Sequence, residues 1–129
     1  MNSPFLVFMT KDKILFSLFA VFLMSGISHF WIFNDNMLHP GDELIGHLSV
    51  WNNRDREMKD ISLTFEILNT AEYEELGKVD ILPRTYYGKY IFYYLPTTMQ
   101  PGDYVVKVSS KSKNEQMLGD VAYRFITIH

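Results

Sequence analysis

Two turns in this chain are each followed directly by a stretch of alternating apolar residues. Residues 39–42 (HPGD) lead into ELIGHLSVWN, and residues 100–103 (QPGD) lead into YVVKVSS. Proline presets φ at about −65° and glycine accepts a positive φ, so Pro-Gly fits the centre of a tight turn. Alternation of apolar and polar side chains is typical of a strand with one buried face. The two segments therefore predict β-structure, with Asp42 and Asp103 as local turn residues.

The same alternation runs through most of the chain after these positions. Residues 61–67 (ISLTFEI) show it most clearly, and residues 43–52, 104–109 and 121–128 repeat it with turn signals between them. Six or seven short strands separated by turns, with almost no helix, are typical of a β-sandwich. The sequence thus predicts an all-β fold, an immunoglobulin-like β-sandwich of six to seven strands.

Three stretches are less regular. Residues 53–60 are polar and predict an exposed loop. Within residues 69–82, the segment EYEELG predicts a helical turn ended by Gly77 and followed by a short strand. Residues 89–95 (KYIFYYL) are apolar or aromatic on both faces of a strand. This last pattern predicts either a strand covered on both sides or an outer face that exposes apolar side chains.

The N-terminal part of the chain has a different character. Residues 14–33 contain no charged side chain and follow Lys11 and Lys13. The first half of this run has the length of the hydrophobic part of a signal peptide, and small residues predict cleavage after Ser28. The whole run, about 20 residues, is also long enough for an uncleaved hydrophobic helix that spans a membrane.

Both interpretations send the rest of the chain out of the cytoplasm, because the lysines precede the apolar run. We therefore divide the chain into residues 1–33, a signal peptide or membrane anchor, and residues 34–129, an Ig-like β-sandwich domain. The expected location is extracytoplasmic, either secreted or anchored to the membrane by the N-terminal helix.

Charge and cysteine content exclude some classes of function. Residues 29–129 carry 10 Lys and Arg against 14 Asp and Glu, a formal charge of −4. Nucleic-acid binding needs a basic stripe, so we expect no nucleic-acid partner. The sequence has no cysteine, which rules out disulfides and thiol chemistry. The apolar core alone must hold the domain together.

Several segments together resemble a known group of domains. Four segments are similar to Ig-like modules of secreted prokaryotic proteins, above all the cell-adhesion-related domains and similar short archaeal exported proteins: PGDELIGHLSVWNN, DISLTFEIL, YIFYYLPTTMQPGDYVVKVSS and YRFITI. The resemblance spans residues 38–128 and involves turn and core residues. It implies an extracytoplasmic, non-enzymatic module for adhesion or assembly in a cell envelope. A more distant resemblance is to archaeal pilins and archaellum-accessory proteins, although KDKILFSLFA lacks their cleavage pattern.

Residue types that perform catalysis or bind metals are present without a recognisable motif. No two histidines have metal-ligand spacing in the sequence: His29, His39, His47 and His129. An acidic region lacks the ligand pattern of a calcium loop and is interpreted as a solvated face: Glu72, Glu74, Glu75 and Asp80. Nucleophile elbows and glycine-rich phosphate loops are also absent. We predict a chain that is not an enzyme and that uses no cofactor or metal.

Aromatic residues are the one surplus, at 16% of the chain. We assign three of the residues in the aromatic segment to the core: Tyr90, Phe92 and Tyr94. We assign the alternate three to the outer face: Ile91, Tyr93 and Leu95. Together with outward residues elsewhere, they predict an exposed aromatic patch of a kind that monomers seldom leave bare. The candidate protein-binding residues are Trp51, Ile91, Tyr93, Tyr123 and Phe125, with Ile45 beside them.

The sequence therefore favours a structural or adhesion module that acts by protein contact. Expected partners are envelope or surface proteins or a second copy of the chain, and the membrane if the N-terminal segment is uncleaved. The alternatives are a β-sandwich that binds a small ligand or carbohydrate by aromatic stacking, and a pilin-like surface subunit.

Overall fold

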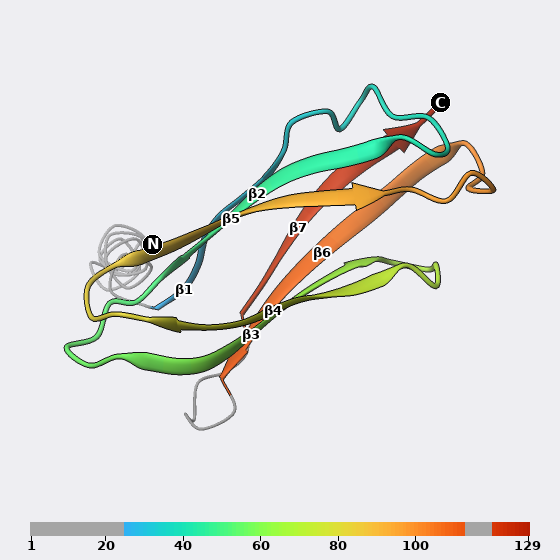
Figure 1. Ribbon diagram of the computed structural model, residues 1–129. Coiled ribbons are helices and arrows are strands. Elements are labelled where there is room, and N and C mark those ends of the chain that lie inside the picture. Colours follow the sequence, from blue (N-terminus) through green and yellow to red (C-terminus); the bar gives the residue numbers. More distant parts are fainter. Residues whose placement is uncertain (1–24, 113–119) are drawn as a thin grey trace, which may run out of the picture.

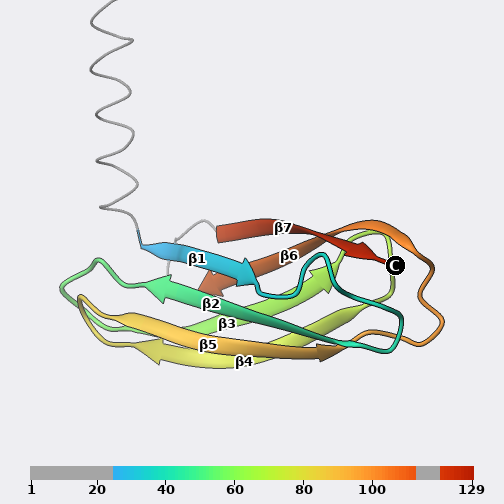
Figure 2. The ribbon, with the colours of Figure 1, turned by 90° about the horizontal axis from the view of Figure 1, so that it is seen from above.

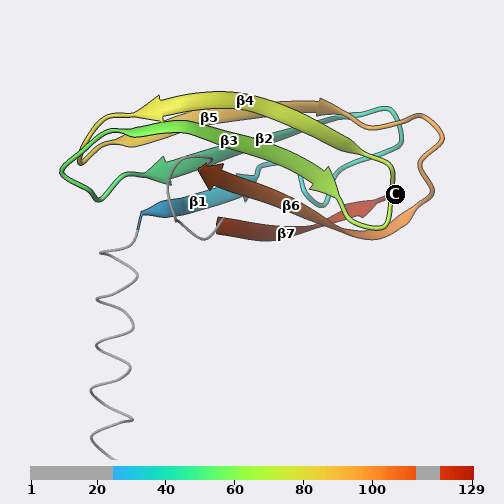
Figure 3. The same cartoon turned by 90° about the horizontal axis from the view of Figure 1, so that it is seen from below.

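The computed structural model describes residues 25–112 and 120–129, and these residues form two antiparallel sheets packed face to face (Figure 1). One sheet has the order β1-β2-β5 and the other β4-β3-β6-β7. Figure 2 looks onto the three-stranded sheet and Figure 3 onto the four-stranded sheet. The described residues contain these strands: β1 Gly26–Ile32, β2 Glu43–Trp51, β3 Met58–Ile67, β4 Tyr73–Ile81, β5 Tyr86–Tyr94, β6 Gly102–Ser112 and β7 Asp120–Ile128. The predicted all-β sandwich is confirmed.

The core lies between the sheets and is mostly aliphatic. Alternate residues of β2 and β3 point inward, as their sequence pattern predicts, and Leu44, Leu48, Leu63 and Phe65 are fully buried. Burying one such side chain stabilises the fold by about 1.5–3 kcal/mol. The contributions are large enough to hold a domain of this size without disulfides.

Strand β1 corrects the predicted domain boundary. Residues 26–32, which the sequence analysis assigned to the N-terminal segment, pair with β2 and bury Phe30 and Ile32. Among the described residues, the sandwich therefore includes the chain from Gly26 on, and the predicted cleavage after Ser28 falls inside a strand. Because β1 carries aromatic residues on its outward face as well, the sequence does not distinguish it from the apolar run before it.

The described strands do not test the predicted signal peptide or membrane anchor. The run 14–24 and the predicted hydrophobic helix lie outside the described residues. Within residues 25–112 and 120–129, we find no helix of sufficient length and apolarity to cross a membrane.

Strand β4 replaces the predicted helical turn. Its residues pair with β3, and the register shifts between Leu63 and Thr64, opposite Gly77 and Glu75. Gly77 has a φ of +113°, which fits a bulge that absorbs one irregular position. The bulge explains why the sequence lacked clear alternation here. Likewise β3 begins at Met58, which is buried, so the exposed loop predicted for 53–60 is shorter than expected.

The two Pro-Gly-Asp segments differ in structure. In the first, the Asp42 N–H donates to the His39 carbonyl at 3.0 Å and Gly41 has a φ of +86°, as in a type II turn. The Asp42 carboxylate accepts a bond from the His39 N–H, so it is the predicted local turn residue. Asp103 is not, because it lies in β6 and accepts a bond from the Thr127 hydroxyl of β7 at 2.8 Å.

Candidate protein-binding face

Strand β5 is inverted relative to its predicted orientation. Ile91 is 1% exposed and Leu95 is 3% exposed, so both belong to the core. The residues assigned to the core are instead exposed on the outer face: Tyr90, Phe92 and Tyr94. Ile91 lies opposite Gly46 of β2, where the absence of a side chain leaves room for an inward isoleucine. The outward prediction for Ile91 is therefore wrong.

Tyr93 also points inward. Its ring packs against Phe65 with 4.7 Å between centroids, and its hydroxyl donates to the Glu72 carboxylate at 2.6 Å. Burial, and then this hydrogen bond, raise the pKa of Tyr93 well above the usual range of a phenol. Tyr93 is therefore a half-buried structural residue and not part of an outer surface.

The outer side of the three-stranded sheet gathers large side chains from all three strands. The register places Trp31, His47 and Tyr90 in one cross-strand row, and Trp51 opposite Tyr86 in another. We define the aromatic face as the outward side chains of β1, β2 and β5 and of the residue after β1: Trp31, Phe33, Ile45, His47, Trp51, Tyr86, Tyr90, Phe92 and Tyr94. Six of these side chains are 47–72% exposed: Trp31, Phe33, Tyr86, Tyr90, Phe92 and Tyr94.

The rings of the aromatic face contact one another. Trp51 stacks on Tyr86 with 4.2 Å between centroids, and His47 meets Tyr90 edge-on at 4.7 Å. Tyr90 in turn lies 6.3 Å from Phe92 and 6.5 Å from Phe33. Ring pairs at these separations restrict side-chain motion, so less entropy is lost when a partner covers them.

Charged groups lie at the rim of the aromatic face. The Glu43 carboxylate beside Tyr94 raises the pKa of that phenol. At the opposite rim, the Arg124 guanidinium lies 5.0 Å from the centroid of Trp31, a cation–π distance. An apolar centre with a charged rim is the usual anatomy of a protein interface.

The predicted binding residues do not form one surface. Trp51 belongs to the aromatic face, while Tyr123 and Phe125 lie on the outer side of the four-stranded sheet. There Tyr123 pairs with Lys107 across the strands, and Phe125 pairs with Val105. The sequence could not assign them to opposite faces of the molecule, because the strand order was unknown.

Strand pairing brings the histidines together in pairs that the sequence does not reveal. The rings of His29 and His47 lie 5.6 Å apart, and those of His39 and His129 lie 6.0 Å apart. In the part of the chain that the structure describes, there is no group of three or more His, Asp or Glu side chains that could hold a metal ion. In the acidic region, Glu74, Glu75 and Asp80 are exposed, whereas Glu72 accepts the bond from Tyr93.

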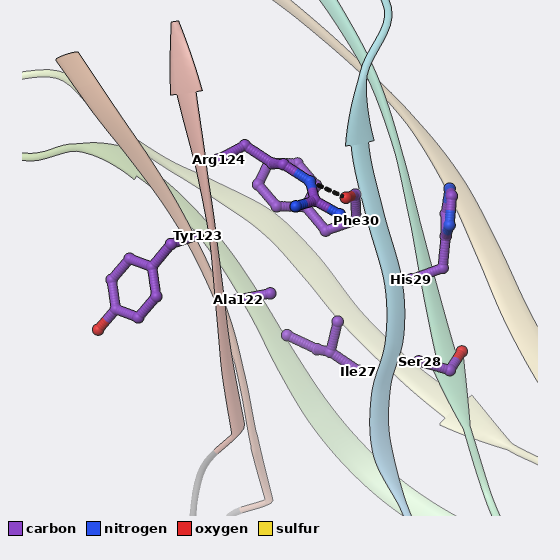
Figure 4. A pocket seen from close by; sticks show the side chains of 7 residues that line it. All are labelled: Ile27, Ser28, His29, Phe30, Ala122, Tyr123 and Arg124. Atoms are coloured by element: carbon purple, nitrogen blue, oxygen red, sulfur yellow. Dashed lines mark hydrogen bonds between the residues drawn. The ribbon is translucent and has the colours of Figure 1, made fainter. Parts of the chain in front are cut away.

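A pocket of about 240 Å³ lies between β1 and β7 (Figure 4). Arg124 reaches across it and donates from Nε to the Phe30 carbonyl at 2.7 Å. The other side chains around it are mostly apolar or small: Ile27, Ser28, His29, Ala122 and Tyr123.

Comparison with solved structures places this arrangement among known sandwiches. The CARDB domain of a Pyrococcus furiosus protein, solved in complex with di-metal ions, matches with a TM-score of 0.62 at 12% identity over 82% of this chain and 88% of that domain. The fold is that of an Ig-like β-sandwich. The Bacillus subtilis sporulation control protein Spo0M matches with a TM-score of 0.58 at 14% identity over 81% of this chain.

The Pseudomonas fluorescens DNA glycosylase AlkC also matches, with a TM-score of 0.62 at 11% identity over 81% of this chain. This chain spans 49% of the length of Spo0M and 30% of that of AlkC. Comparisons with protein-family models and with curated proteins give no match. At these identities, the likeness shows the fold alone.

Proposed function

We propose that this chain is a non-enzymatic structural or adhesion module of the cell envelope that binds another protein through the aromatic face. The observation that carries the proposal is the gathering of large aromatic side chains on the outer side of one sheet, where they are exposed on β1 and β5 and half-buried at Trp51 of β2. The partner is an envelope or surface protein with a flat, uncharged contact surface. The proposed location is extracytoplasmic, with residues 14–24 as the targeting or anchoring segment.

The size of the face supports this proposal. Aromatic side chains bury about 150–250 Å² each, so the six that are 47–72% exposed offer on the order of 700 Å². A standard interface buries about 800 Å² on each partner. The aromatic face is thus large enough for a specific contact and larger than the apolar patches of many monomers.

Carbohydrate binding is the second candidate, because the Tyr86 ring is 63% exposed beside Trp51 and could stack on a sugar. The stacked Trp51–Tyr86 pair uses one ring face of each residue internally, which leaves less aromatic surface for a ligand. A pilin-like assembly role would need the N-terminal segment and rests on its apolar composition alone. Protein contact is therefore the function that the face supports best.

Site-specific photocrosslinking in the cells that naturally contain the chain tests the proposal. Phe33 lies on the aromatic face and is 54% exposed, and Phe125 lies on the opposite sheet and is 74% exposed. Benzoylphenylalanine can replace either phenylalanine in the full chain with little change of shape. We expect protein adducts at Phe33, their loss when Trp51→Lys is added, and none at Phe125.

Equal adducts at both positions, or none at Phe33, would overturn the proposal. Glycan adducts at Phe33 in place of protein adducts would favour the carbohydrate function. The lysine is placed at Trp51 and not at Tyr93, since Tyr93 packs on Phe65 and its replacement would disturb the core.

A further inference from the structure

Two of the four edge strands of this sandwich cover each other. The Asp120 carboxylate of β7 accepts a bond from the Ile27 N–H of β1 at 2.6 Å, and Arg124 of β7 donates to the Phe30 carbonyl of β1 (Figure 4). Further along, the Thr127 N–H donates to the Asp35 carbonyl at 2.9 Å. The backbone groups that β1 and β7 would offer to another strand are therefore partly occupied.

The edge of β4 carries the features that natural proteins use against edge-to-edge pairing. Its ladder with β3 shifts register twice, and Gly77 forms a bulge. Its exposed residues include Glu74, Glu75 and Lys78. Bulges and charges of this kind oppose the addition of another strand.

Strand β5 is the remaining edge, and it has no such protection. Its nine residues pair with β2 without a register shift, and Lys89 is its only charged residue. Within residues 25–112 and 120–129, no hydrogen bond caps the side of β5 that faces away from β2. A long, regular edge of low charge is a template for strand addition.

The hydrogen-bond pattern identifies the free backbone groups of β5. At one end the Leu95 N–H donates to Asp42, and at the other the Asn52 N–H donates to Thr85, both at 2.9 Å. Bonded and non-bonded pairs alternate in an antiparallel ladder, so the odd-numbered residues of β5 bond to β2. The N–H and C=O groups that point to the free edge belong to Tyr86, Gly88, Tyr90, Phe92 and Tyr94.

We propose that β5 pairs antiparallel with β5 of a second copy of this chain, around a two-fold axis at Tyr90. This contact uses the edge of the sheet, so it goes beyond the proposed partner of the aromatic face. The pairing would join two sheets into one of six strands, in the order β1-β2-β5-β5-β2-β1. All outward groups of β5 would then find a partner, and the two aromatic faces would become one continuous surface.

The sequence of β5 is complementary to itself in this register. Gly88 would lie opposite Phe92 of the second copy, and an aromatic ring across from a glycine is a stabilising cross-strand pair. Tyr86 would lie opposite Tyr94, and the two Tyr90 residues would meet at the axis. Lys89 would lie opposite Ile91, so no like charges face each other along the strand.

The charges near this edge also fit a second copy. A groove of about 230 Å³ between β4 and β5 is lined by Lys89 together with Glu74 and Glu75. The two-fold axis at Tyr90 is perpendicular to the joined sheet and would place the two grooves side by side, with Lys89 of each copy near the two carboxylates of the other. The groove therefore offers charge complementarity to its own copy that an unrelated neutral strand would lack.

Substitutions of Gly88 test the pairing with a matched control. Gly88→Pro removes an outward N–H, whereas Gly88→Ala keeps it, and both add a Cβ that meets the movable His47 ring at 3.2 Å. Because the two copies are related by a two-fold axis, Gly88→Pro removes two hydrogen bonds from the dimer. We therefore expect the dimer dissociation constant of Gly88→Pro to rise about tenfold or more. Analytical ultracentrifugation of the full chain in a mild detergent measures it.

We expect dimers for the wild type and Gly88→Ala. A wild type that stays monomeric at about 100 μM, or a Gly88→Pro variant that dimerises like wild type, would overturn the proposal. Hydrogen exchange of the wild type covers the case in which Gly88→Pro fails to fold. The outward amides of Gly88, Tyr90 and Phe92 should exchange more slowly as the concentration rises, and equal rates would contradict strand pairing.

The two proposals fail separately. The Phe33 ring lies 6.5 Å from Tyr90 of β5, so an adduct between two copies of the chain, recognised by its mass, is assigned to the dimer, and only adducts with a different protein report the partner of the aromatic face. Loss of the dimer with retained Phe33 adducts would overturn strand pairing alone. A retained dimer without Phe33 adducts would overturn the protein-binding function alone.

Discussion

Asn52 joins two loops from a fully buried position, and its replacement should cost much of the stability of the domain. The side chain follows β2 and is 0% exposed. Its Nδ2 donates to the carbonyls of Arg56 and Ile81 at 2.9 Å and of Leu82 at 3.1 Å, while its Oδ1 accepts from the Arg54 N–H at 3.0 Å. One amide thus ties the β2–β3 loop to the connection between β4 and β5.

The expected magnitude follows from these bonds. Each hydrogen bond contributes about 0.5–1.5 kcal/mol net, and a buried group left without a partner costs about 1–3 kcal/mol. Asn52→Ala should therefore lower the free energy of unfolding by about 3 kcal/mol. Asn52→Asp keeps the shape but has no donor when ionised, so it should be worse at pH 7 and recover partly below about pH 4, as it becomes protonated.

Urea unfolding followed by tryptophan fluorescence measures both variants in the full chain. With a slope of about 1–1.5 kcal/mol per molar urea, Asn52→Ala should unfold about 2–3 M earlier than wild type. The exposed Asn36→Ala is the control and should stay within about 0.5 kcal/mol of wild type. If Asn52→Asp is as stable as wild type at pH 7, the donor role assigned to the amide is wrong.

Two further predictions concern residues that shape β2 and β5. Gly46→Ala should lower the free energy of unfolding by about 1–3 kcal/mol, because the added Cβ would meet the Trp31 carbonyl oxygen at 2.9 Å and the backbone would have to move. Gly88→Ala is the matched control. Equal thermal stability of the two variants would contradict the close approach at Gly46. Tyr93→Phe should cost about 1 kcal/mol through the lost bond to Glu72. Because the fold raises the pKa of Tyr93, the stability that this phenol contributes is present below its unfolded value of about 10 and lost as the pH rises above it. Melting temperatures from pH 9 to 12 should therefore fall less steeply for Tyr93→Phe than for wild type, and parallel curves would refute this linkage.

Alternation in the sequence was sufficient to assign the buried side chains of a strand whose other face is polar. In β3, Ser62, Thr64 and Glu66 separate the apolar residues, so the inward set was assigned correctly. In β5 both faces are apolar or aromatic, and a shift of one residue exchanges the two sets. The orientation depends on Gly46 across the ladder, and that pairing is set by tertiary structure.

Contacts between distant residues explain the other differences. Strand β1 was hidden in an apolar run, and the bonds of Ile27 and Phe30 to β7 join residues 93 and 94 positions apart. The histidine pairs arise in the same way, from strands or loops that the fold brings together. Of the residues predicted to point outward on β2 and β5, Trp51 does so, whereas Ile91 and Tyr93 point inward.

The two outer faces of the sandwich differ in how their aromatic residues are arranged, and folding alone does not require this difference. Both faces are solvent-exposed sides of antiparallel sheets, where folding asks only for residues that suit a strand. The four-stranded sheet has Ser62, Thr64 and Lys107 among its outward residues and exposes Tyr123 and Phe125 on its edge strand β7. The three-stranded sheet differs because its rings, Tyr90 and Phe92 among them, contact one another across the face, although exposed rings gain little from burial and favour aggregation. The same strand positions could hold threonine or lysine, so folding of the monomer does not by itself require the aromatic face, and this supports the protein contact that we propose for it.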